Sequence, residues 1–517
     1  MNKPRILIVI SCYFPFIGGA ENQAKLLAEN LVKMGWEISV LTKKRSARLK
    51  EKEEINGVTV LRVIGVPGIF INLLKLRSKY DVVLFAGQLS NVSRLKVFGQ
   101  MLMGAIVKLF VRKKIFLWPT SGASKYTYLF NTKITRKLLQ VFDGVFCKSN
   151  EQMKLFSSLV GESVEIFGPP WSMIDTQLYM PPTLEEKILL RKEIGIPENA
   201  KVLLFTGRLI ESKGIELLIS AFERLSKSYS DAFLLIVGAV SDSDPLKNKY
   251  VQRINSSKFS EQTFKLVLNE DDVVKYFKSA DIFVFPTFSE GCPVVQLEAM
   301  SAGLICVASD LEPITEKIED GFNGFTFKTG DIKGLIQKLE TAVQSVEDAR
   351  IATRARESVV PKYSIIPVVE RWESMLTEFW LRETYGVMIL TPWAYPRIGG
   401  IQTMSFETAK RLTMQGFKVT LMSRKHDDKL PTREVIEGIN FIRLSCKPIV
   451  MQFQLILFLI KEWSNFRHFS MWGAYGSFLT VPILLIALTV QLLGKKVSIR
   501  LSNQVMEDRI YANKVII

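Results

Sequence analysis

The sequence has few of the residues that most often bind metals or form cross-links. Its 517 residues include five cysteines, and no two of them form a C-x-x-C pair. This scarcity argues against a disulfide framework or a structural zinc site, and it suggests a reducing compartment. Histidine occurs only as His426 and His468. Residues 1–380 therefore contain none, which excludes a histidine general base in that part of the chain.

Long hydrophobic runs are also scarce. The apolar run Ile6–Ile10 near the N-terminus is too short for a signal peptide. The stretch Phe469–Gly494 carries no charged residue, but Pro482 interrupts its apolar centre, Phe478–Leu493. That centre is shorter than the ~20 residues that a membrane-spanning helix requires. We expect a buried or interfacial helix there rather than a transmembrane span.

Negative charge is scarce at both ends of the chain. Residues 1–180 hold 26 Lys and Arg against 12 Asp and Glu, residues 181–380 hold 24 against 30, and residues 381–517 hold 18 against 9. Because the basic segments are also apolar, we expect them to dock onto an anionic surface, although solubility alone also explains a basic protein. No RNP, helix-turn-helix or zinc-finger pattern occurs, so a membrane leaflet is favoured over nucleic acid.

The composition is that of a folded protein, with 48% hydrophobic and 23% charged residues. At roughly 100–200 residues per domain, the length predicts two to four domains. Short apolar runs alternate with helical patterns from the start: Arg5–Ser11 predicts a buried strand, Gly18-Gly19 a turn, and Glu21–Met34 a helix that ends at Gly35. Such alternation indicates β-α-β units around parallel sheets.

A second series of this kind begins at Lys201. The expected strands are Val202–Phe205, Ala232–Val237, Phe264–Leu268, Ile282–Phe285 and Ile305–Ala308. The expected helices are Ile215–Ser226, Val273–Ser279, Val294–Ser301 and Ile332–Val343. An amphipathic helix, Tyr363–Trp380, follows them. Two doubly wound α/β domains in succession place a ligand at the carboxyl ends of their strands.

The last segment repeats the first at a constant offset of 381 positions. Tyr395–Gly400 matches Phe14–Gly19, and the same offset relates the pairs Gly35 and Gly416, Gly57 and Gly438, and Arg62 and Arg443. We therefore expect four parts: residues 1–182, residues 183–362, a tail helix at 363–381, and a truncated repeat of the first domain at 382–517. Gly399-Gly400 has only a structural role in this scheme, because no counterpart of the second domain follows it in this chain.

Two motifs carry the chemistry. In Ser289–Gly303, Glu290 follows a predicted strand and Glu298 lies eight positions later within a short helix. The backbone N–H groups from Cys292 to Val295 at the start of that helix form a potential anion site. In Gly207–Gly214, Arg208 and Lys213 bring two cations to the edge of the sheet, where a diphosphate needs both.

Together these motifs resemble those of retaining glycosyltransferases of the GT-B fold, family 4. The resemblance covers residues 1 to about 381 and includes the Gly-Gly loop, G-R-L-x-x-x-K-G, E-x7-E and the tail helix. It implies two Rossmann-like domains that face a cleft, followed here by a third, incomplete Rossmann-like domain. It also implies transfer of a sugar from a nucleotide-diphosphate sugar to an acceptor hydroxyl, in bacterial polysaccharide or glycolipid assembly.

The resemblance implies a role for each motif residue. Arg208 and Lys213 would hold the donor diphosphate, Glu290 would lie beside the transferred sugar, and Glu298 would bind the ribose hydroxyls. The other donor-binding positions that it implies are Gly18, Gly19, Gly207, Gly291, Cys292, Pro293, Val294 and Val295. Many relatives carry histidine where this chain reads Trp118–Gly122, and there Thr120 and Ser121 are candidate sugar contacts.

No cofactor and no metal are expected. The only D-x-D motif, Asp242-Ser-Asp244, has the composition of a solvated turn. The expected partners are the nucleotide sugar, a lipid-linked or saccharide acceptor and an anionic membrane surface, on the cytoplasmic face of the cell membrane. Two alternatives remain. The first is another GT-B enzyme, such as a nucleotide-sugar epimerase or a phosphorylase, although a phosphorylase would need a pyridoxal lysine motif that this chain does not contain. The second is a non-catalytic scaffold that docks a partner.

Overall fold

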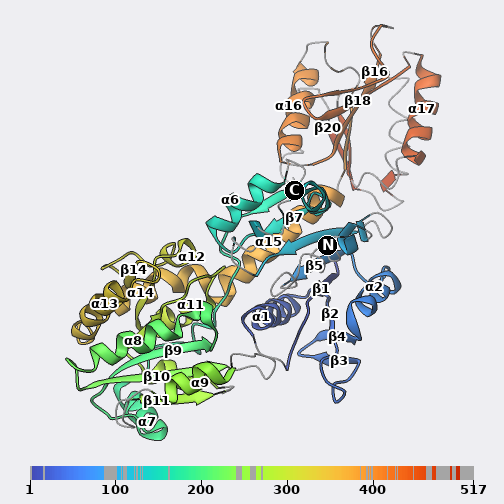
Figure 1. The fold of residues 1–517 in the computed structure, drawn as a ribbon. Coiled ribbons are helices and arrows are strands. Elements are labelled where there is room, and N and C mark those ends of the chain that lie inside the picture. The colour runs from blue at the N-terminus through green and yellow to red at the C-terminus, as the bar shows by residue number, and fades with distance from the viewer. Residues whose placement is uncertain are drawn as a thin grey trace. The chain divides into compact units, whose positions relative to one another are not determined.

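The structure of the chain is a computed structural model, which forms two compact units, Met1–Glu373 and Ser374–Ile517 (Figure 1). The structure describes residues 3–15, 18–86, 102–105, 107–108, 113–120, 123, 126–127, 130, 132–160, 164–239, 247–256, 264–268, 272–384, 386–391, 394, 396, 400–415, 417–425, 427, 429–445, 447–461, 468–472, 490–491 and 496–500.

The first unit begins with an eight-stranded sheet of order β3-β4-β2-β1-β5-β6-β7-β8. Its strands are β1 Ile6–Val9, β2 Ile38–Lys43, β3 Lys52–Ile55, β4 Val58–Val63, β5 Val82–Ala86, β6 Lys114–Trp118, β7 Gly144–Phe146 and β8 Glu165–Phe167. Its helices include α1 Gly19–Lys33, α2 Gly65–Lys75, α5 Lys133–Leu139 and α6 Asn150–Leu159. All neighbouring strands pair in parallel except β3 and β4. Helices cover a parallel sheet on both faces, which is why β1 and β5 are apolar throughout.

A six-stranded parallel sheet of order β11-β10-β9-β12-β13-β14 follows. Its strands are β9 Lys201–Arg208, β10 Ala232–Ala239, β11 Phe264–Leu268, β12 Ile282–Phe285, β13 Ile305–Ser309 and β14 Phe325–Phe327. The helices are α7 Leu184–Ile194, α8 Ile215–Leu225, α9 Lys247–Asn255, α10 Val274–Ser279, α11 Val294–Ser301, α12 Glu312–Thr315 and α13 Ile332–Gln344. The predicted elements of this sheet therefore form within two residues of their expected bounds, except that β9 extends three residues beyond the predicted end at Phe205.

Side chains of β9 alternate between two buried clusters, one on each face of this sheet. Val202 and Leu204 belong to one cluster, and Leu203 and Phe205 to the other. The strand order reverses at β9, because β10 lies on one side of it and β12 on the other. In open α/β sheets a ligand binds outside the carboxyl ends of the strands at this reversal. A ligand-binding site is therefore expected at the carboxyl ends of β9 and β12.

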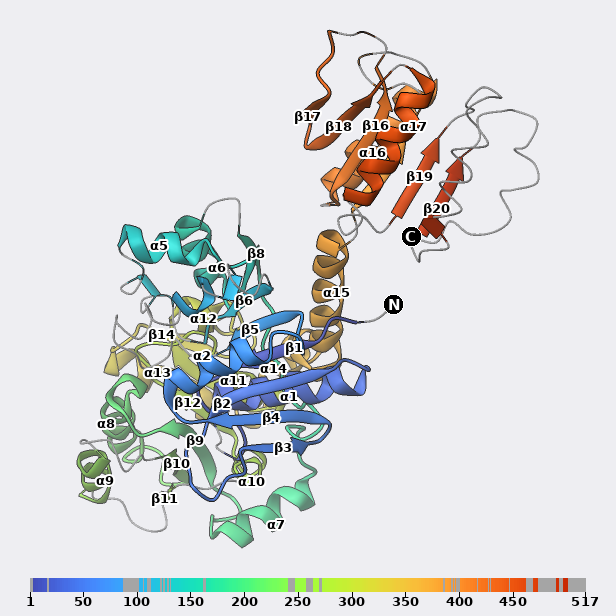
Figure 2. The same cartoon turned by 90° about the vertical axis from the view of Figure 1, so that its right-hand side faces the viewer.

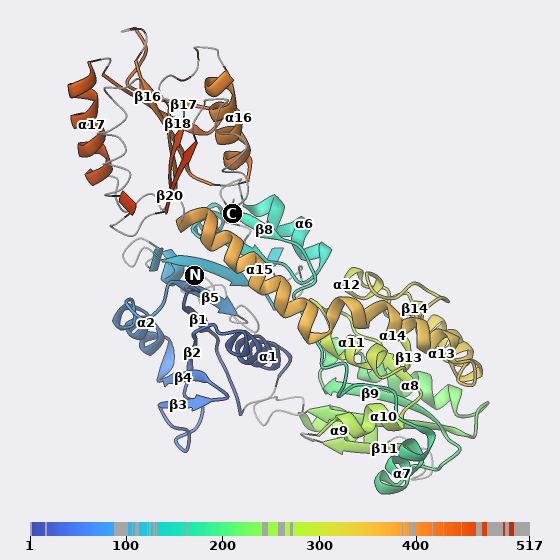
Figure 3. The same ribbon diagram turned by 180° about the vertical axis from the view of Figure 1, so that it is seen from behind.

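The helical end of the first unit differs from the prediction. One helix was expected over Tyr363–Trp380, whereas the structure has α14, Ala349–Tyr363, and then α15, Ile365–Thr384 (Figures 2 and 3). The two helices meet at Ser364, whose φ and ψ of −62° and 156° are extended. On α15, Trp372 is buried against three aromatic residues of the first sheet and the segment after it, at ring distances of 4.1–5.0 Å: Trp118, Phe146 and Trp171.

The second unit contains a sheet of order β17-β18-β16-β15-β19-β20. Its elements are β15 Val387–Leu390, α16 Gly400–Met414, β16 Val419–Arg424, β17 Arg433–Ile436, β18 Ile439–Leu444, α17 Pro448–Lys461, β19 His468–Trp472 and β20 Lys496–Arg500. Helices α16 and α17 lie on opposite faces of this sheet (Figure 1). The strand order is that of β3-β4-β2-β1-β5-β6 in the first sheet.

Local details of these two sheets also agree at the offset of 381. In the first sheet Arg62 forms an ion pair with Glu53, and in the last sheet Arg443 pairs with Glu434. Both arginines are buried. The β3–β4 turn contains Asn56 at φ 49°, and the β17–β18 turn contains Glu437 at the same φ. In each turn a glycine with positive φ follows.

Within the described ranges, no helix is both long enough and apolar enough to cross a membrane. Most of the stretch Phe478–Leu493, for which a buried or interfacial helix is predicted, lies outside these ranges.

Candidate active site

The end of β9 presents the first cation of the candidate site. Gly207 has a φ of +150°, and Arg208, the last residue of the strand, is exposed. Among the residues that the structure describes, none forms a hydrogen bond or an ion pair with the Arg208 guanidinium. Arg208 is therefore available to a ligand at the strand-order reversal.

The second cation, Lys213, is held by a tight turn. A single 3₁₀ turn, Glu211–Lys213, ends at Gly214, whose φ is +72°. A Cβ atom on Gly214 would lie 1.9 Å from the carbonyl oxygen of Pro286, so only glycine fits. Two hydrogen bonds to the Ser212 carbonyl oxygen come from the segment after β12: the Phe288 N–H at 2.8 Å and the Thr287 hydroxyl at 2.9 Å. The turn is thus packed directly against the loop that carries Glu290.

Lys213 and Glu290 form an ion pair, and both side chains are largely buried. The Thr287 Oγ1 lies 3.0 Å from Glu290 Oε1 and within hydrogen-bond distance of it. The Lys213 ammonium also lies 5.2 Å from the ring centroid of Phe285, the last residue of β12. The structure therefore brings Lys213 and Glu290 together, as their positions after the neighbouring strands β9 and β12 predict.

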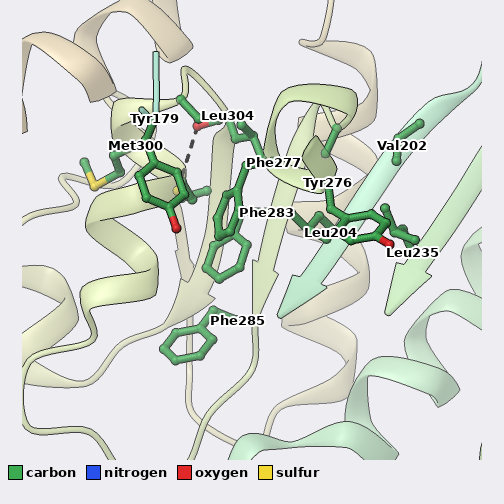
Figure 4. Close-up of a cluster of buried hydrophobic side chains, with 14 of the residues drawn as sticks. Tyr179, Val202, Leu204, Leu235, Tyr276, Phe277, Phe283, Phe285, Met300 and Leu304 are labelled. Carbon is green, nitrogen blue, oxygen red and sulfur yellow. Dashed lines mark hydrogen bonds between the residues drawn. The ribbon is translucent and has the colours of Figure 1, made fainter. Parts of the chain in front are cut away.

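Glu298 lies one helix further along, on α11. Burial raises the pKa of its carboxyl to about 7, and a hydrogen bond with the side chain of Tyr179 opposes that rise. Figure 4 shows the Tyr179 ring beside Phe277, and the two rings meet edge to face at 5.2 Å. The tyrosine precedes the second sheet in sequence, and sequence reasoning did not identify it as a partner of Glu298.

The N-terminus of α11 has no side-chain cap. Pro293 occupies the N-cap position and accepts no hydrogen bond through its side chain, so the first N–H groups of Val294 and Val295 have no such partner. One residue earlier, the Ser172 hydroxyl donates to Cys292 Sγ at 3.5 Å. Ser172 lies in the segment between β8 and α7, so this contact joins the start of α11 to the end of the first domain.

The predicted residues of the first domain are described only in part. Gly18 is the N-cap of α1 and Gly19 its first residue, so α1 begins two residues earlier than expected. A Cβ atom on Gly18 would lie 2.4 Å from a carboxylate oxygen of Glu21, whereas nothing lies near that of Gly19. Thr120 Oγ1 is buried and has no hydrogen-bond partner in the described part of the chain. Ser121 lies outside the described residues.

A buried lysine that the motifs did not indicate also lies in this region. Lys148 is 5% exposed, and its ammonium lies 4.6 Å from the ring centroid of Trp118. Burial lowers the pKa of Lys148 to about 8, and the charges of Cys292 and Glu21 act in the opposite direction. A single lysine after a short apolar strand has no recognisable spacing, so no sequence pattern indicates it.

Metal ligands do not gather in the described ranges: no group there contains three or more His, Cys, Asp or Glu side chains able to hold an ion. The D-x-D motif, Asp242 to Asp244, lies outside these ranges.

A known protein family matches the part of the chain that contains the second sheet. Residues 186–358 match the family described as "Glycosyl transferases group 1". These residues form a glycosyl transferases group 1 domain. This group 1 domain contains both motifs and the four charged residues to which roles are assigned: Arg208, Lys213, Glu290 and Glu298.

Two curated relatives extend the comparison. An uncharacterized glycosyltransferase of Methanocaldococcus jannaschii is 27% identical over 341 residues, which cover 60% of this chain and 80% of that protein. The lipopolysaccharide 1,2-N-acetylglucosaminetransferase of Salmonella typhimurium is 29% identical over 198 residues, which cover 36% of this chain and 51% of that enzyme. In that second case the match spans about half of the relative.

A solved structure of Anabaena HepE in complex with UDP-glucose matches 72% of this chain and 99% of that chain. Its TM-score is 0.60 at 18% sequence identity. The likeness shows the fold, which is GT-B: two Rossmann-like α/β domains.

Proposed function

We propose that the chain is a retaining glycosyltransferase, which moves a sugar from a nucleotide-diphosphate sugar to an acceptor hydroxyl. One observation carries this proposal: Arg208 and the Lys213–Glu290 pair lie together where the strand order of the group 1 domain reverses. Two cations and a carboxylate in that position suit a diphosphate joined to a sugar. The printed names of the relatives and of the HepE complex agree with this chemistry.

Bond cleavage sets the electrostatic requirement. As the sugar–phosphate bond breaks, negative charge develops on the diphosphate and positive charge on the sugar. Arg208 and Lys213 stabilise the departing diphosphate, at about 3–4 kcal/mol for one well-aimed donor in a partly dehydrated cleft. Before this step, when the donor binds, Lys213 exchanges Glu290 for phosphate, and the Glu290 carboxylate turns to the transferred sugar.

Glu298 binds the nucleoside. An ionised carboxylate accepts hydrogen bonds from two neighbouring hydroxyls, such as those of a ribose. The N–H groups of Cys292, Val294 and Val295, around the start of α11, and the backbone of Gly291 contact the sugar and phosphate. Gly18-Gly19 approaches the phosphates from the first domain.

Retention fits the absence of histidine in residues 1–380, which excludes an inverting enzyme with a histidine base. Without a histidine base, an oxygen of the leaving phosphate takes the proton of the acceptor hydroxyl, on the face from which the phosphate departs. The proposal needs no cofactor and no metal ion. An NMR assay of the product tests it, because a product with inverted anomeric configuration would rule out this mechanism.

The acceptor is a saccharide or a lipid-linked saccharide at the cytoplasmic face of a membrane. Ile64, Val66 and Ile71 are exposed at α2, which ends in Lys75. On α5, exposed Ile134 has Lys133, Arg136 and Lys137 around it. Each basic residue near an anionic leaflet contributes about 1 kcal/mol to peripheral binding. Polysaccharide or glycolipid assembly is the setting that these features and the Salmonella relative favour.

Residues 382–517 are a second copy of the first domain in this proposal. The shared strand order, the Arg62–Glu53 and Arg443–Glu434 ion pairs and the matching turns support an internal duplication.

Calorimetric titration of the full chain with UDP, GDP and ADP tests the donor site. We expect one nucleotide to bind, and Arg208→Ala and Glu298→Ala each to weaken it more than tenfold, or about 1.4 kcal/mol. If none of the three binds to the folded chain, the transferase proposal fails and a non-catalytic scaffold becomes the better explanation.

A further inference from the structure

Lys148 occupies an unusual place for a cation. It lies two residues after β7 and immediately before Ser149, the N-cap of α6. The whole residue is 5% exposed. Its backbone N–H donates to Gln152 Oε1 at 2.8 Å, which fixes the backbone from which the side chain extends.

The ammonium of Lys148 has no polar partner among the described residues. The ammonium lies 4.6 Å from the centroid of the Trp118 ring. The charges of Cys292 and Glu21 also act on it, but neither residue forms a hydrogen bond or an ion pair with it. A buried charge without a partner is costly, and a cation–π contact offsets only part of that cost. Packing alone would be served better by methionine.

The neighbours of Lys148 belong to the two segments proposed to hold the donor. Glu21 lies in the first turn of α1, two residues after Gly19. Cys292 precedes α11, an eight-residue helix whose N-terminus lacks a side-chain cap. A helix N-terminus favours negative charge, and the charge of the buried Lys148 interacts with that of Cys292, two residues before α11. The uncapped N-terminus of α11 and the buried ammonium of Lys148 therefore both favour a bound anion.

We propose that Lys148 is a third cation of the donor site and binds, with the N-terminus of α11, an anionic group of the nucleotide sugar. This inference rests on the proposed function. Two groups of the donor have the required charge: the diphosphate, which every nucleotide sugar carries, and a carboxylate on the transferred sugar, as in a uronic acid.

Titration of the full chain with UDP, UDP-glucose and UDP-glucuronic acid shows which of these two groups Lys148 binds. The variants are Lys148→Met, which keeps the length of the side chain and removes its charge, and Arg208→Ala. If Lys148→Met weakens the binding of all three ligands tenfold or more, Lys148 binds the diphosphate. If it weakens the binding of UDP-glucuronic acid only, Lys148 binds the sugar carboxylate. Unchanged affinity for all three, in a variant that melts at or above the wild-type temperature, overturns the proposal.

Arg208→Ala keeps this test apart from the test of the proposed function. If Arg208→Ala weakens ligand binding and Lys148→Met does not, the proposed donor site is supported and the proposed role of Lys148 is wrong. If neither variant changes affinity, both proposals fail. Should the chain prefer GDP or ADP, the corresponding sugar nucleotides replace those of UDP.

A pH series adds a readout that a merely structural lysine would not move. The wild-type affinity should fall as the pH rises through 8, and that fall should be absent in Lys148→Met. Because Cys292, just before α11, and Glu21, on α1, both act on the charge of Lys148, the series is repeated in Cys292→Ser and Glu21→Gln. A fall that persists in Lys148→Met contradicts the proposal.

Discussion

Lys213 and Glu290 form an ion pair although 77 positions separate them in the sequence. The pair joins the turn after β9 to the loop after β12. The Thr287 hydroxyl lies within hydrogen-bond distance of the Ser212 carbonyl oxygen in that turn and of the Glu290 carboxylate in that loop. In the proposed mechanism the donor diphosphate takes the place of Glu290 beside Lys213. The carboxylate therefore competes with the phosphate until the sugar gives it another partner.

This competition predicts opposite effects of two substitutions on nucleotide binding. Glu290→Gln should tighten the binding of the preferred nucleoside diphosphate by about two- to tenfold, since it removes a negative charge beside the phosphates. Lys213→Met should weaken it by tenfold or more. The same Glu290→Gln variant should lose most of its transferase activity. Calorimetry of the nucleoside diphosphate and an assay of sugar transfer measure the two effects.

The control for this prediction is Glu312→Gln, which removes a carboxylate of the same domain that pairs with Lys154. It should leave nucleotide affinity unchanged. Weaker nucleotide binding by Glu290→Gln would show that the Lys213–Glu290 pair positions the lysine rather than competing for it.

The turn around Lys213 predicts a steric requirement at Gly214. Alanine at this position places a Cβ atom 1.9 Å from the Pro286 carbonyl oxygen, so Gly214→Ala must displace the turn and its lysine. Gly195→Ala is the matched control, because Gly195 has the same φ of +72° but nothing closer than Lys265 Nζ at 3.8 Å. We expect Gly195→Ala to cost about 1 kcal/mol of stability and Gly214→Ala considerably more. Equal melting temperatures would contradict the packing described for this turn.

Glu298 predicts a pH dependence of stability. Because burial raises the pKa of its carboxyl to about 7 from an ordinary 4.5, the protonated form is favoured in the folded chain. Its stabilising contribution is present below pH 4.5 and is lost as the pH rises through 7. Glu298→Gln should therefore stabilise the chain at pH 8 by about 1–3 kcal/mol and change little at pH 5. Melting temperatures at the two pH values measure this, with the exposed Glu357→Gln as control.

Nucleotide affinity should follow the opposite trend. Ribose hydroxyls donate to the ionised carboxylate, so wild-type affinity should rise between pH 5.5 and pH 7.5. Glu298→Gln should bind weakly and show no such rise. A flat wild-type profile would remove Glu298 from the ribose site.

Much of the group 1 domain could be predicted from the sequence because its strands are apolar runs with turns on either side. β11 and β12 coincide with their predicted bounds. α14 was missed because Pro361 lies within its last turn and its polar composition gives a weak pattern. β3 was missed because Lys52–Ile55 is short and charged, and it becomes a strand only by pairing with β4.

The candidate site shows the same division between local and tertiary information. The spacing of Arg208, Lys213, Glu290 and Glu298 was visible in the sequence, since each follows a recognisable strand. The contacts of Tyr179 with Glu298 and of Lys148 with Trp118 were not, because they join segments that only the folded chain brings together. Burial, rather than sequence spacing, distinguishes Lys148 from the other lysines of the first domain.

Burial of Lys148 predicts that the lysine lowers stability at neutral pH. Its pKa is lowered to about 8 from an ordinary 10.5, so the folded chain disfavours the charged form. The resulting destabilisation is present at pH 7 and disappears as the pH rises from 8 to 10.5, where the unfolded chain also loses the proton. Lys148→Met should therefore be more stable than the wild type by about 1–3 kcal/mol at pH 7, and the difference should shrink by pH 10. Lys133→Met, at an exposed position of α5, should show neither effect in the same melting experiments. A destabilised Lys148→Met at pH 7 would mean that the ammonium has a partner in the folded chain, and the need for an anionic ligand beside α11 would then disappear.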